Sequence, residues 1–192
     1  MNIATDKATL RREALARRDA AAKNNAQAGQ SLRDRFLSAI PLPPAAVVSG
    51  FWPMGDEIDV RPLLEALIAR GHAVALPTVV RRGEPLLFRA WRPDDALVPA
   101  TLGTSVPAAD KPELRPQIVI TPLLAFDARG FRVGYGAGYY DMTLARLRAA
   151  GDVLAVGVGY DAQEVDTVPI EDWDQPLDWI VTERRALRVQ PT

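Results

Sequence analysis

The segment Gln117–Asp141 reads QIVITPLLAFDARGFRVGYGAGYYD, an apolar run followed by a glycine-rich stretch and a tyrosine pair. The apolar residues predict the most hydrophobic strand of the chain at 117–121, continuing into 123–126. Residues 139–150 predict a helix. Because strands that alternate with helices are typical of α/β domains, this segment predicts an α/β fold with a mostly parallel sheet.

The flanking sequence extends the same alternation in both directions. Further strands are expected at 46–51, 72–78, 86–91 and 153–159, with an edge strand at 179–182 and a loop over 98–116. Helices are expected at 6–22, with Thr5 as N-cap, at 25–39, and between an N-cap at Asp59 and a C′ residue at Gly71. The apolar sides of the first two helices hold Leu10, Ala14 and Leu15, and Leu32, Phe36 and Ile40.

The length and this pattern predict one domain. At roughly 150 residues per domain, 192 residues form a single unit, 1–192. We expect a three-layer α/β/α architecture, with a core over 45–185 and the N-terminal helices of residues 1–40 packed on the outside of the sheet.

Composition excludes several kinds of chemistry. The chain has no Cys and a single His, His72, which opens an apolar strand and is interpreted as structural. Disulfides, thiol nucleophiles, Fe–S clusters, Cys-based zinc sites and multi-histidine metal centres are therefore excluded. Any reaction must use carboxylates, Lys or Arg, hydroxyls and backbone amides.

The net charge of −1 conceals a strong asymmetry along the chain. Residues 1–35 contain eight Lys or Arg against four Asp or Glu, whereas residues 152–183 contain nine Asp or Glu and no Lys or Arg. The two segments are expected either to attract each other or to hold an anion and a cation. The polar, Arg-rich start predicts no signal peptide, and no run reaches the roughly 18 apolar residues of a membrane span, so we expect a cytoplasmic protein.

The glycine segment, Gly130–Asp141, is the strongest local signal. Four of the 13 glycines fall between Gly130 and Gly138, between a predicted strand and a predicted helix. Such a loop turns several N–H groups toward one anion, and the helix start adds the positive end of its dipole. The spacing matches neither a Walker motif nor a dinucleotide fingerprint. The pattern predicts a phosphate cradle, and the alternative is a tight strand–helix turn.

A few charged and aromatic residues are further candidates. Lys7 and Arg11 share one helix face and suit a polyphosphate together with Arg132, or they form a solvated surface.

Glu57 follows the first strand at the end where α/β proteins bind ligands, and Trp52 beside it either stacks on a flat ring or packs in the core. Asp141 could hold Mg²⁺ or cap a helix, and Asp174 could reach the same ion.

In their order along the chain, these motifs resemble the 5-formyltetrahydrofolate cyclo-ligase family. The resemblance covers nearly the whole sequence, and the glycine motif is its most specific part. The matching motifs are KATLR from Lys7 to Arg11, GDEID at 55–59, PLLAFD at 122–127, GYGAGYYD at 134–141, VPIEDWD at 168–174 and VTE at 181–183. Bacterial members often have His at the position of Trp173 and Arg at that of Met142.

The resemblance implies an ATP- and Mg²⁺-dependent ligase. It would cyclise 5-formyltetrahydrofolate to 5,10-methenyltetrahydrofolate through a phosphorylated formyl group, with no nucleophile from the enzyme. By motif, the ATP contacts would be Lys7, Arg11, Arg132, Val133, Gly134, Tyr135, Gly136, Ala137, Gly138, Tyr139 and Tyr140. The folate contacts would be Trp52, Glu57, Tyr135, Gly136, Ala137, Gly138 and Tyr139, and the metal ligands Asp141 and Asp174.

Two other functions remain open at this stage. One is a sugar-phosphate isomerase or CoA-transferase-like enzyme of similar fold, which would not require ATP. The other is a nucleotide-binding regulatory module without turnover. We expect a monomer that binds reduced folate and ATP, with no membrane partner and, given its slightly negative charge, no nucleic-acid partner. Asp141→Ala is expected to cost turnover with little loss of fold, and Lys7→Ala to weaken ATP more than folate.

Overall fold

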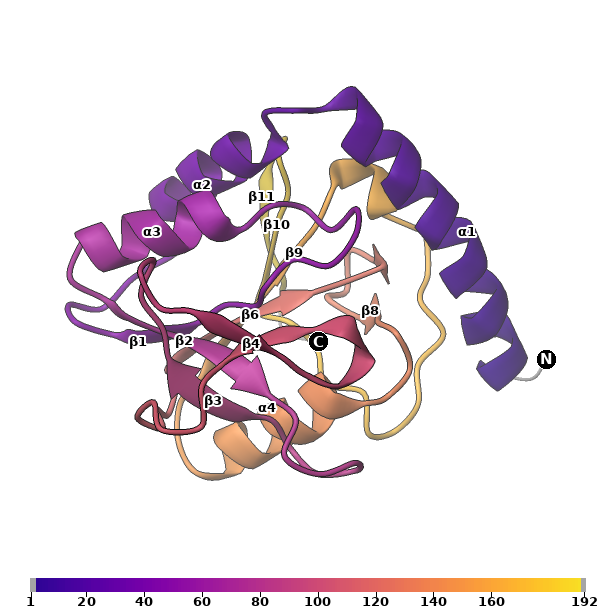
Figure 1. Ribbon diagram of the computed structural model, residues 1–192. Coiled ribbons are helices and arrows are strands. Elements are labelled where there is room, and N and C mark those ends of the chain that lie inside the picture. Colours follow the sequence, from indigo (N-terminus) through magenta and orange to yellow (C-terminus); the bar gives the residue numbers. More distant parts are fainter. Residues whose placement is uncertain (1–2, 191–192) are drawn as a thin grey trace.

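A seven-stranded sheet forms the centre of the computed structural model, which describes residues 3–190 (Figure 1). The strand order is β11-β10-β9-β6-β1-β2-β3, parallel from β10 to β2 with an antiparallel strand at each edge. The strands are β1 (Val47–Ser49), β2 (Ala73–Thr78), β3 (Leu87–Ala90), β6 (Ile118–Pro122), β9 (Leu154–Val158), β10 (Trp179–Val181) and β11 (Ala186–Arg188). The predicted mostly parallel α/β sheet is confirmed.

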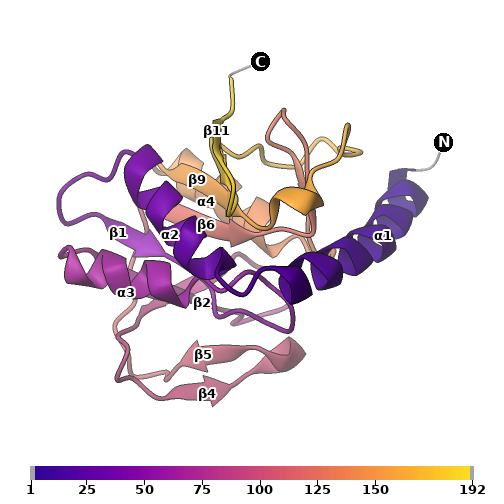
Figure 2. The same ribbon diagram turned by 90° about the horizontal axis from the view of Figure 1, so that it is seen from above.

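Helices cover both faces of this sheet (Figures 1 and 2). They are α2 (Ala28–Ala39) and α3 (Arg61–Ala69) on one face and α4 (Tyr139–Ala149) on the other. Because successive strand residues point to opposite faces, Ile118 and Ile120 pack with Phe36 of α2, whereas Val119 packs with Leu144 of α4. The three layers therefore follow from the apolar run that begins the segment 117–141. Within residues 3–190, no helix has both the length and the apolar character to cross a bilayer.

The first helix, α1 (Ile3–Asn24), takes a different position from α2. It lies mainly over the hairpin of β7 (Ala125–Phe126) and β8 (Arg132–Val133) and over the short helix at 161–163, beside the central sheet. Ala14 is fully buried there against Leu124 and Val133. The prediction that both N-terminal helices pack on the outside of the sheet is therefore correct for α2 only, because α1 covers the hairpin instead. Leu15, expected on the apolar side of α1, is 40% exposed.

The apolar run after β6 leaves the sheet, so the expected continuation through 123–126 is wrong. Pro122 ends β6, and the amide of Gln163 donates hydrogen bonds to the carbonyls of Leu123 and Leu124, at 2.7 and 2.9 Å. The buried carboxylate of Asp127 then accepts the N–H groups of residues 129, 131 and 168. These bonds hold the turn from which the glycine segment starts.

Several element boundaries also differ from the predictions. Residues 98–116 contain a hairpin of β4 (Leu97–Pro99) and β5 (Ser105–Pro107), whose strands are too short and proline-rich to give an alternating signal. Strand β10 is internal, because the short β11 pairs with it. Thr5 lies inside α1, and Val60 is the N-cap of α3, although the Asp59 carboxylate still accepts the N–H of Arg61.

Candidate active site

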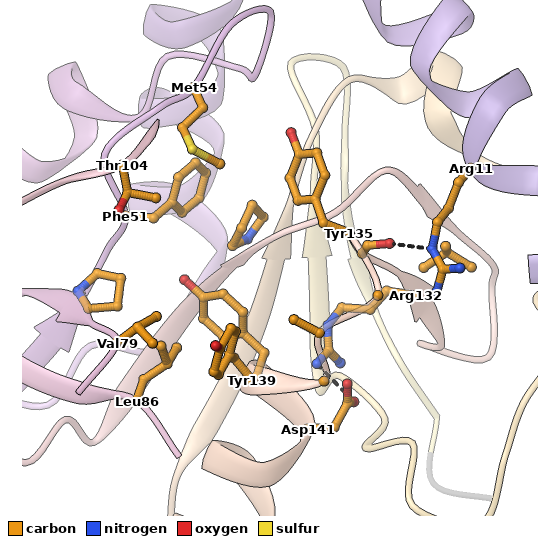
Figure 3. Close-up of a pocket in the computed structure, with 18 of the residues that line it drawn as sticks. Arg11, Phe51, Met54, Val79, Leu86, Thr104, Arg132, Tyr135, Tyr139 and Asp141 are labelled. Atoms are coloured by element: carbon orange, nitrogen blue, oxygen red, sulfur yellow. Dashed lines mark hydrogen bonds and ion pairs between the residues drawn. The ribbon is translucent and has the colours of Figure 1, made fainter. Parts of the chain in front are cut away.

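A cavity of about 500 Å³ opens at the carboxyl ends of β1, β2 and β6 (Figure 3). Residues from α1, the loop after β1, the glycine segment and the segment 171–174 line it. Every site residue expected from the sequence lies on its wall, namely Lys7, Arg11, Trp52, Glu57, Arg132, Val133, Gly134, Tyr135, Gly136, Ala137, Gly138, Tyr139, Tyr140, Asp141 and Asp174. The fold thus brings together in one cavity residues up to 167 positions apart in the chain.

The cavity has two chemically different halves. Figure 3 shows Phe51, Met54, Val79 and Leu86 on one side, and Arg11, Arg132 and Asp141 on the other. Tyr135 and Tyr139 lie between these two groups. The first half suits a flat, mostly apolar ligand, and the second suits a charged one.

The glycine segment forms the boundary of the two halves, and its backbone is open to the cavity. Gly136 and Gly138 have φ of +98° and +68°, a conformation that glycine adopts at little cost, and Gly138 is the N-cap of α4. Within residues 3–190, the N–H groups of residues 134–138 donate no hydrogen bond. A row of unpartnered N–H groups that leads into a helix N-terminus is the arrangement that binds phosphate in other proteins.

One face of α1 supplies the cations of the charged half. Lys7 Nζ lies 2.9 Å from Glu171 Oε2 and 2.6 Å from Asp174 Oδ2. Burial lowers the pKa of Lys7, but the hydrogen bonds to Asp174 and Glu171 outweigh it, so the pKa of the ammonium lies above its ordinary value. Arg11 donates from Nε to the carbonyl of Gly134, at 2.9 Å. Arg11 is therefore held at the glycine segment, and the charged Lys7 at residues 171–174.

Asp141 and Arg132 form an ion pair at the floor of the charged half. Asp141 Oδ1 accepts from Arg132 Nη2 at 2.9 Å and from the N–H of Gln175 at 3.0 Å. Arg132 Nη1 also donates to the carbonyl of Gln175, at 2.8 Å. Burial lowers the pKa of Arg132, yet a guanidinium stays protonated in a protein. The pair ties α4 to the segment that carries Asp174.

The two expected metal ligands each keep one carboxylate oxygen available. Asp141 uses Oδ1 for its protein contacts and Asp174 uses Oδ2, while their other oxygens accept no hydrogen bond from residues 3–190. No cluster of three or more acidic or histidine ligands exists in that part of the chain. The donor set fits Mg²⁺, which takes one or two carboxylates and fills its other positions with water and phosphate oxygens.

Glu57 is the buried carboxylate at the boundary of the apolar half. It is 8% exposed and accepts from the N–H of Met54 at 2.9 Å and from the hydroxyl of Tyr135 at 3.1 Å. Burial raises the pKa of Glu57, against the opposing effects of the Met54 N–H, Arg18 and Tyr135. Trp52 lines the cavity next to it, edge-on to Trp91 with ring centroids 5.7 Å apart.

Several residues of this site were not predicted from the sequence, among them Phe51, Met54, Val79 and Leu86 of the apolar half. Glu171 pairs with Lys7, and Thr104 and Ser105 of the β4–β5 hairpin line the cavity. Arg18 bonds to Tyr135. The spacing of Arg18 held a usable signal, because residues seven apart on a helix share a face, and Arg11 is already a candidate. Glu171 and the hairpin carried no such signal.

Three comparisons with known proteins agree on one family. Residues 3–183 match the model of the 5-formyltetrahydrofolate cyclo-ligase family. The 5-formyltetrahydrofolate cyclo-ligase of Escherichia coli K12 is 36% identical over 160 residues, covering 80% of this chain and 87% of that protein. The Haemophilus influenzae protein of the same name is 31% identical over 79% of this chain and 83% of that protein.

The comparison of folds agrees with the comparisons of sequence. A solved structure of the 5,10-methenyltetrahydrofolate synthetase of Aquifex aeolicus matches with a TM-score of 0.79 at 25% identity. The match covers 97% of this chain and 94% of that protein. The family match over residues 3–183 includes every residue of the cavity wall.

Proposed function

The chain belongs to the 5-formyltetrahydrofolate cyclo-ligase family, and on this premise we propose that it cyclises 5-formyltetrahydrofolate to 5,10-methenyltetrahydrofolate using ATP and Mg²⁺. ADP and phosphate are the other products. The observation that carries the proposal is one cavity whose apolar and charged halves meet at the glycine segment. Such a cavity places a flat ring next to a polyphosphate, which is what a transfer between them needs.

The charged half is assigned to ATP. The unpartnered N–H groups of residues 134–138 and the N-terminus of α4 would hold phosphate oxygens. Lys7 and Arg11 would add positive charge from the opposite side. Both terminal nitrogens of Arg132 already donate hydrogen bonds, to Asp141 and to Gln175. We therefore assign Arg132 to the floor of this half, where its positive charge would attract the phosphates without a bidentate hydrogen bond to them.

Asp141 and Asp174 would hold Mg²⁺ through the oxygens that accept no bond from residues 3–190. When bound, Mg²⁺ would supply positive charge that offsets the negative charge developing on the transferring group. Lys7 contacts Asp174 through Oδ2 and leaves Oδ1 to the ion, so its ammonium would lie beside both the metal site and the phosphates.

The apolar half is assigned to the folate. The carboxylate of Glu57 would accept hydrogen bonds from ring N–H groups, and Trp52 and Tyr139 would border the ring. Residues 135–138 are exposed and line the cavity where its two halves meet, so they would contact both ligands and serve in both assignments.

The reaction needs alignment and charge neutralisation more than a nucleophile from the protein. The formyl oxygen attacks the γ-phosphorus, the bond to the β-phosphate oxygen breaks, and ADP leaves. The substrate's N10 then attacks the activated formyl carbon and loses its proton, and phosphate leaves with the formyl oxygen. Both attacking atoms belong to the substrate, in keeping with a chain that has no Cys and whose single His lies outside the cavity wall.

The direct test is a turnover assay. The purified protein, mixed with 5-formyltetrahydrofolate and MgATP, should produce the ultraviolet absorbance of methenyltetrahydrofolate and one ADP per product. Absence of both product and ATP binding would favour the isomerase or transferase alternative, which does not require ATP. ATP binding without product at any magnesium concentration would favour the regulatory module.

Gly136→Ala should raise the KM for ATP by about tenfold. A Cβ at this position would lie 3.2 Å from Arg11 Cζ, and the residue has φ of +98°. The methyl group would therefore displace Arg11 from the Gly134 carbonyl as well as strain the loop. Steady-state kinetics with varied ATP measure the effect.

Gly83→Ala is the matched control for Gly136→Ala. Gly83 has a similar φ of +79°, but a Cβ there meets nothing within 4 Å. It carries the backbone strain without the contact, so its KM for ATP should stay at the wild-type value. Equal effects of both substitutions would remove the role assigned to the Arg11 contact.

A further inference from the structure

Arg18 is a buried cation to which the proposed mechanism assigns no role. It is 7% exposed and lies on the same face of α1 as Lys7 and Arg11. Its Nη1 donates to the hydroxyl of Tyr135 at 2.7 Å and lies 3.8 Å from Glu57 Oε1. Arg18 therefore reaches the cavity only through the side chains of Tyr135 and Glu57.

The three side chains form a chain of contacts with a defined direction. Since the guanidinium can only donate, the Tyr135 hydroxyl accepts from Arg18 and gives its own proton to Glu57 Oε1, at 3.1 Å. The second oxygen of Glu57 is fixed by the N–H of Met54. Both oxygens of the carboxylate are thus oriented by donors, and one of these donors depends on Arg18.

A role in packing alone accounts poorly for Arg18. Its Nε has no hydrogen-bond partner within residues 3–190, so burying it is costly. Replacing a buried ion pair by apolar residues of similar volume is often neutral or stabilising, and the neighbouring Ala14 on this face already packs on apolar side chains. The hydrogen bond and the ion pair that Arg18 makes within residues 3–190 are both with cavity residues, Tyr135 and Glu57.

We infer that Arg18 is a positioning residue for the folate, holding the Glu57 carboxylate and the Tyr135 hydroxyl in the orientation that receives the ring. The inference rests on the proposed function, which assigns Glu57 to the folate. It also gives α1 two tasks, because Lys7 and Arg11 near its start serve the phosphates while Arg18, about 16 Å along the axis from Lys7, serves the ring.

The charge of Arg18 also acts on the ionisation of Glu57. The titratable and charged groups that face this carboxylate are Arg18 from α1, Tyr135 from the glycine segment and Tyr140 from α4. Burial and the charge of Glu57 raise the pKa of Tyr140. Burial already raises the pKa of Glu57, and Arg18 opposes that effect. Removing the cation raises the pKa further, so the ionised form is lost at a higher pH.

The test compares Arg18→Met and Arg18→Lys in the full-length enzyme. Arg18→Met should raise the KM for 5-formyltetrahydrofolate by about tenfold, with the KM for ATP within about twofold of wild type. The acid limb of kcat/KM for the folate should move to higher pH. Arg18→Lys keeps the charge and should return the limb toward its wild-type position. Arg12→Met, at an exposed position on the same helix, should change neither quantity.

The outcomes separate this inference from the proposed function. A wild-type protein without cyclo-ligase activity refutes the proposed function itself. An active wild type whose Arg18→Met variant keeps its folate KM and its acid limb overturns the positioning role. Equal rises in both KM values with a lowered melting temperature also overturn it, because they show a structural role only. If Arg18→Met does not fold, Arg18→Lys decides, since a positioning role requires a raised folate KM with an unmoved limb.

Discussion

Replacing Asp141 by asparagine should lower kcat for the cyclisation by about 100-fold, with a smaller loss of stability than alanine would cause at this position. Asparagine keeps an oxygen that accepts from Arg132 and from the N–H of Gln175, now at 2.9 and 3.0 Å, but it removes the charge offered to Mg²⁺. Initial rates measured over a range of magnesium concentrations give kcat and the apparent metal affinity, and the affinity should fall as well.

The choice of asparagine follows from the ion pair. The sequence alone suggests that Asp141→Ala leaves the fold intact. Alanine would, however, take from the buried Arg132 both its counter-charge and its hydrogen-bond acceptor, whereas asparagine removes the charge and keeps the acceptor. Removing one partner of a buried pair costs about 3–5 kcal/mol of unfolding free energy, and the partial exposure of Asp141 places the cost at or below the lower end. Urea denaturation of both variants separates the two effects, with Asp141→Ala destabilised more than Asp141→Asn.

Asp178→Asn is the matched control for the charge. Asp178 also pairs with an arginine, Arg148 at 3.2 Å, but it lies outside the cavity wall. Its kcat should stay within about twofold of wild type, since a surface ion pair contributes little. A wild-type kcat for Asp141→Asn at saturating magnesium would show that Asp141 serves only to hold Arg132.

The parts of the fold that could be predicted are those with a strong local signal. The alternation of Ile118, Val119 and Ile120 between two helical layers is set by the pleat of a strand, so an apolar run of that length is enough to infer it. Strand β11 and the β4–β5 hairpin have three-residue strands, and their pairing depends on neighbours far away in the chain. Such strands carry no periodicity from which to predict them.

The same division holds at the site. The glycine segment could be identified because its conformation depends on its own residues, since the positive φ of Gly136 and Gly138 is one that glycine favours. The partners of Lys7 were not, since Glu171 and Asp174 lie more than 160 positions away. The charge asymmetry left open whether the basic and acidic segments attract each other, and this contact shows that they do.

Replacing Lys7 by methionine should raise the KM for ATP by about 30-fold while the KM for the folate changes by less than about threefold. Methionine retains an unbranched apolar side chain of similar length, so the packing of this buried position is kept and the ammonium is lost. Because Lys7 has a raised pKa, the wild-type side chain stays protonated through neutral pH, and the loss should be the same between about pH 6 and 9.

A second measurement follows from the contacts of Lys7 in the absence of ligand. Its ammonium lies 2.6 Å from Asp174 Oδ2, so it competes with any cation for that carboxylate. Lys7→Met should therefore bind Mg²⁺ more tightly than wild type when no nucleotide is present, as titration calorimetry would show. Lys23→Met, on the same helix and paired with Asp19 at an exposed site, is the control and should change neither affinity. An equal rise in both KM values would contradict the assignment of Lys7 to the phosphates, because a cation that served only to join α1 to residues 171–174 would disturb both halves of the cavity together.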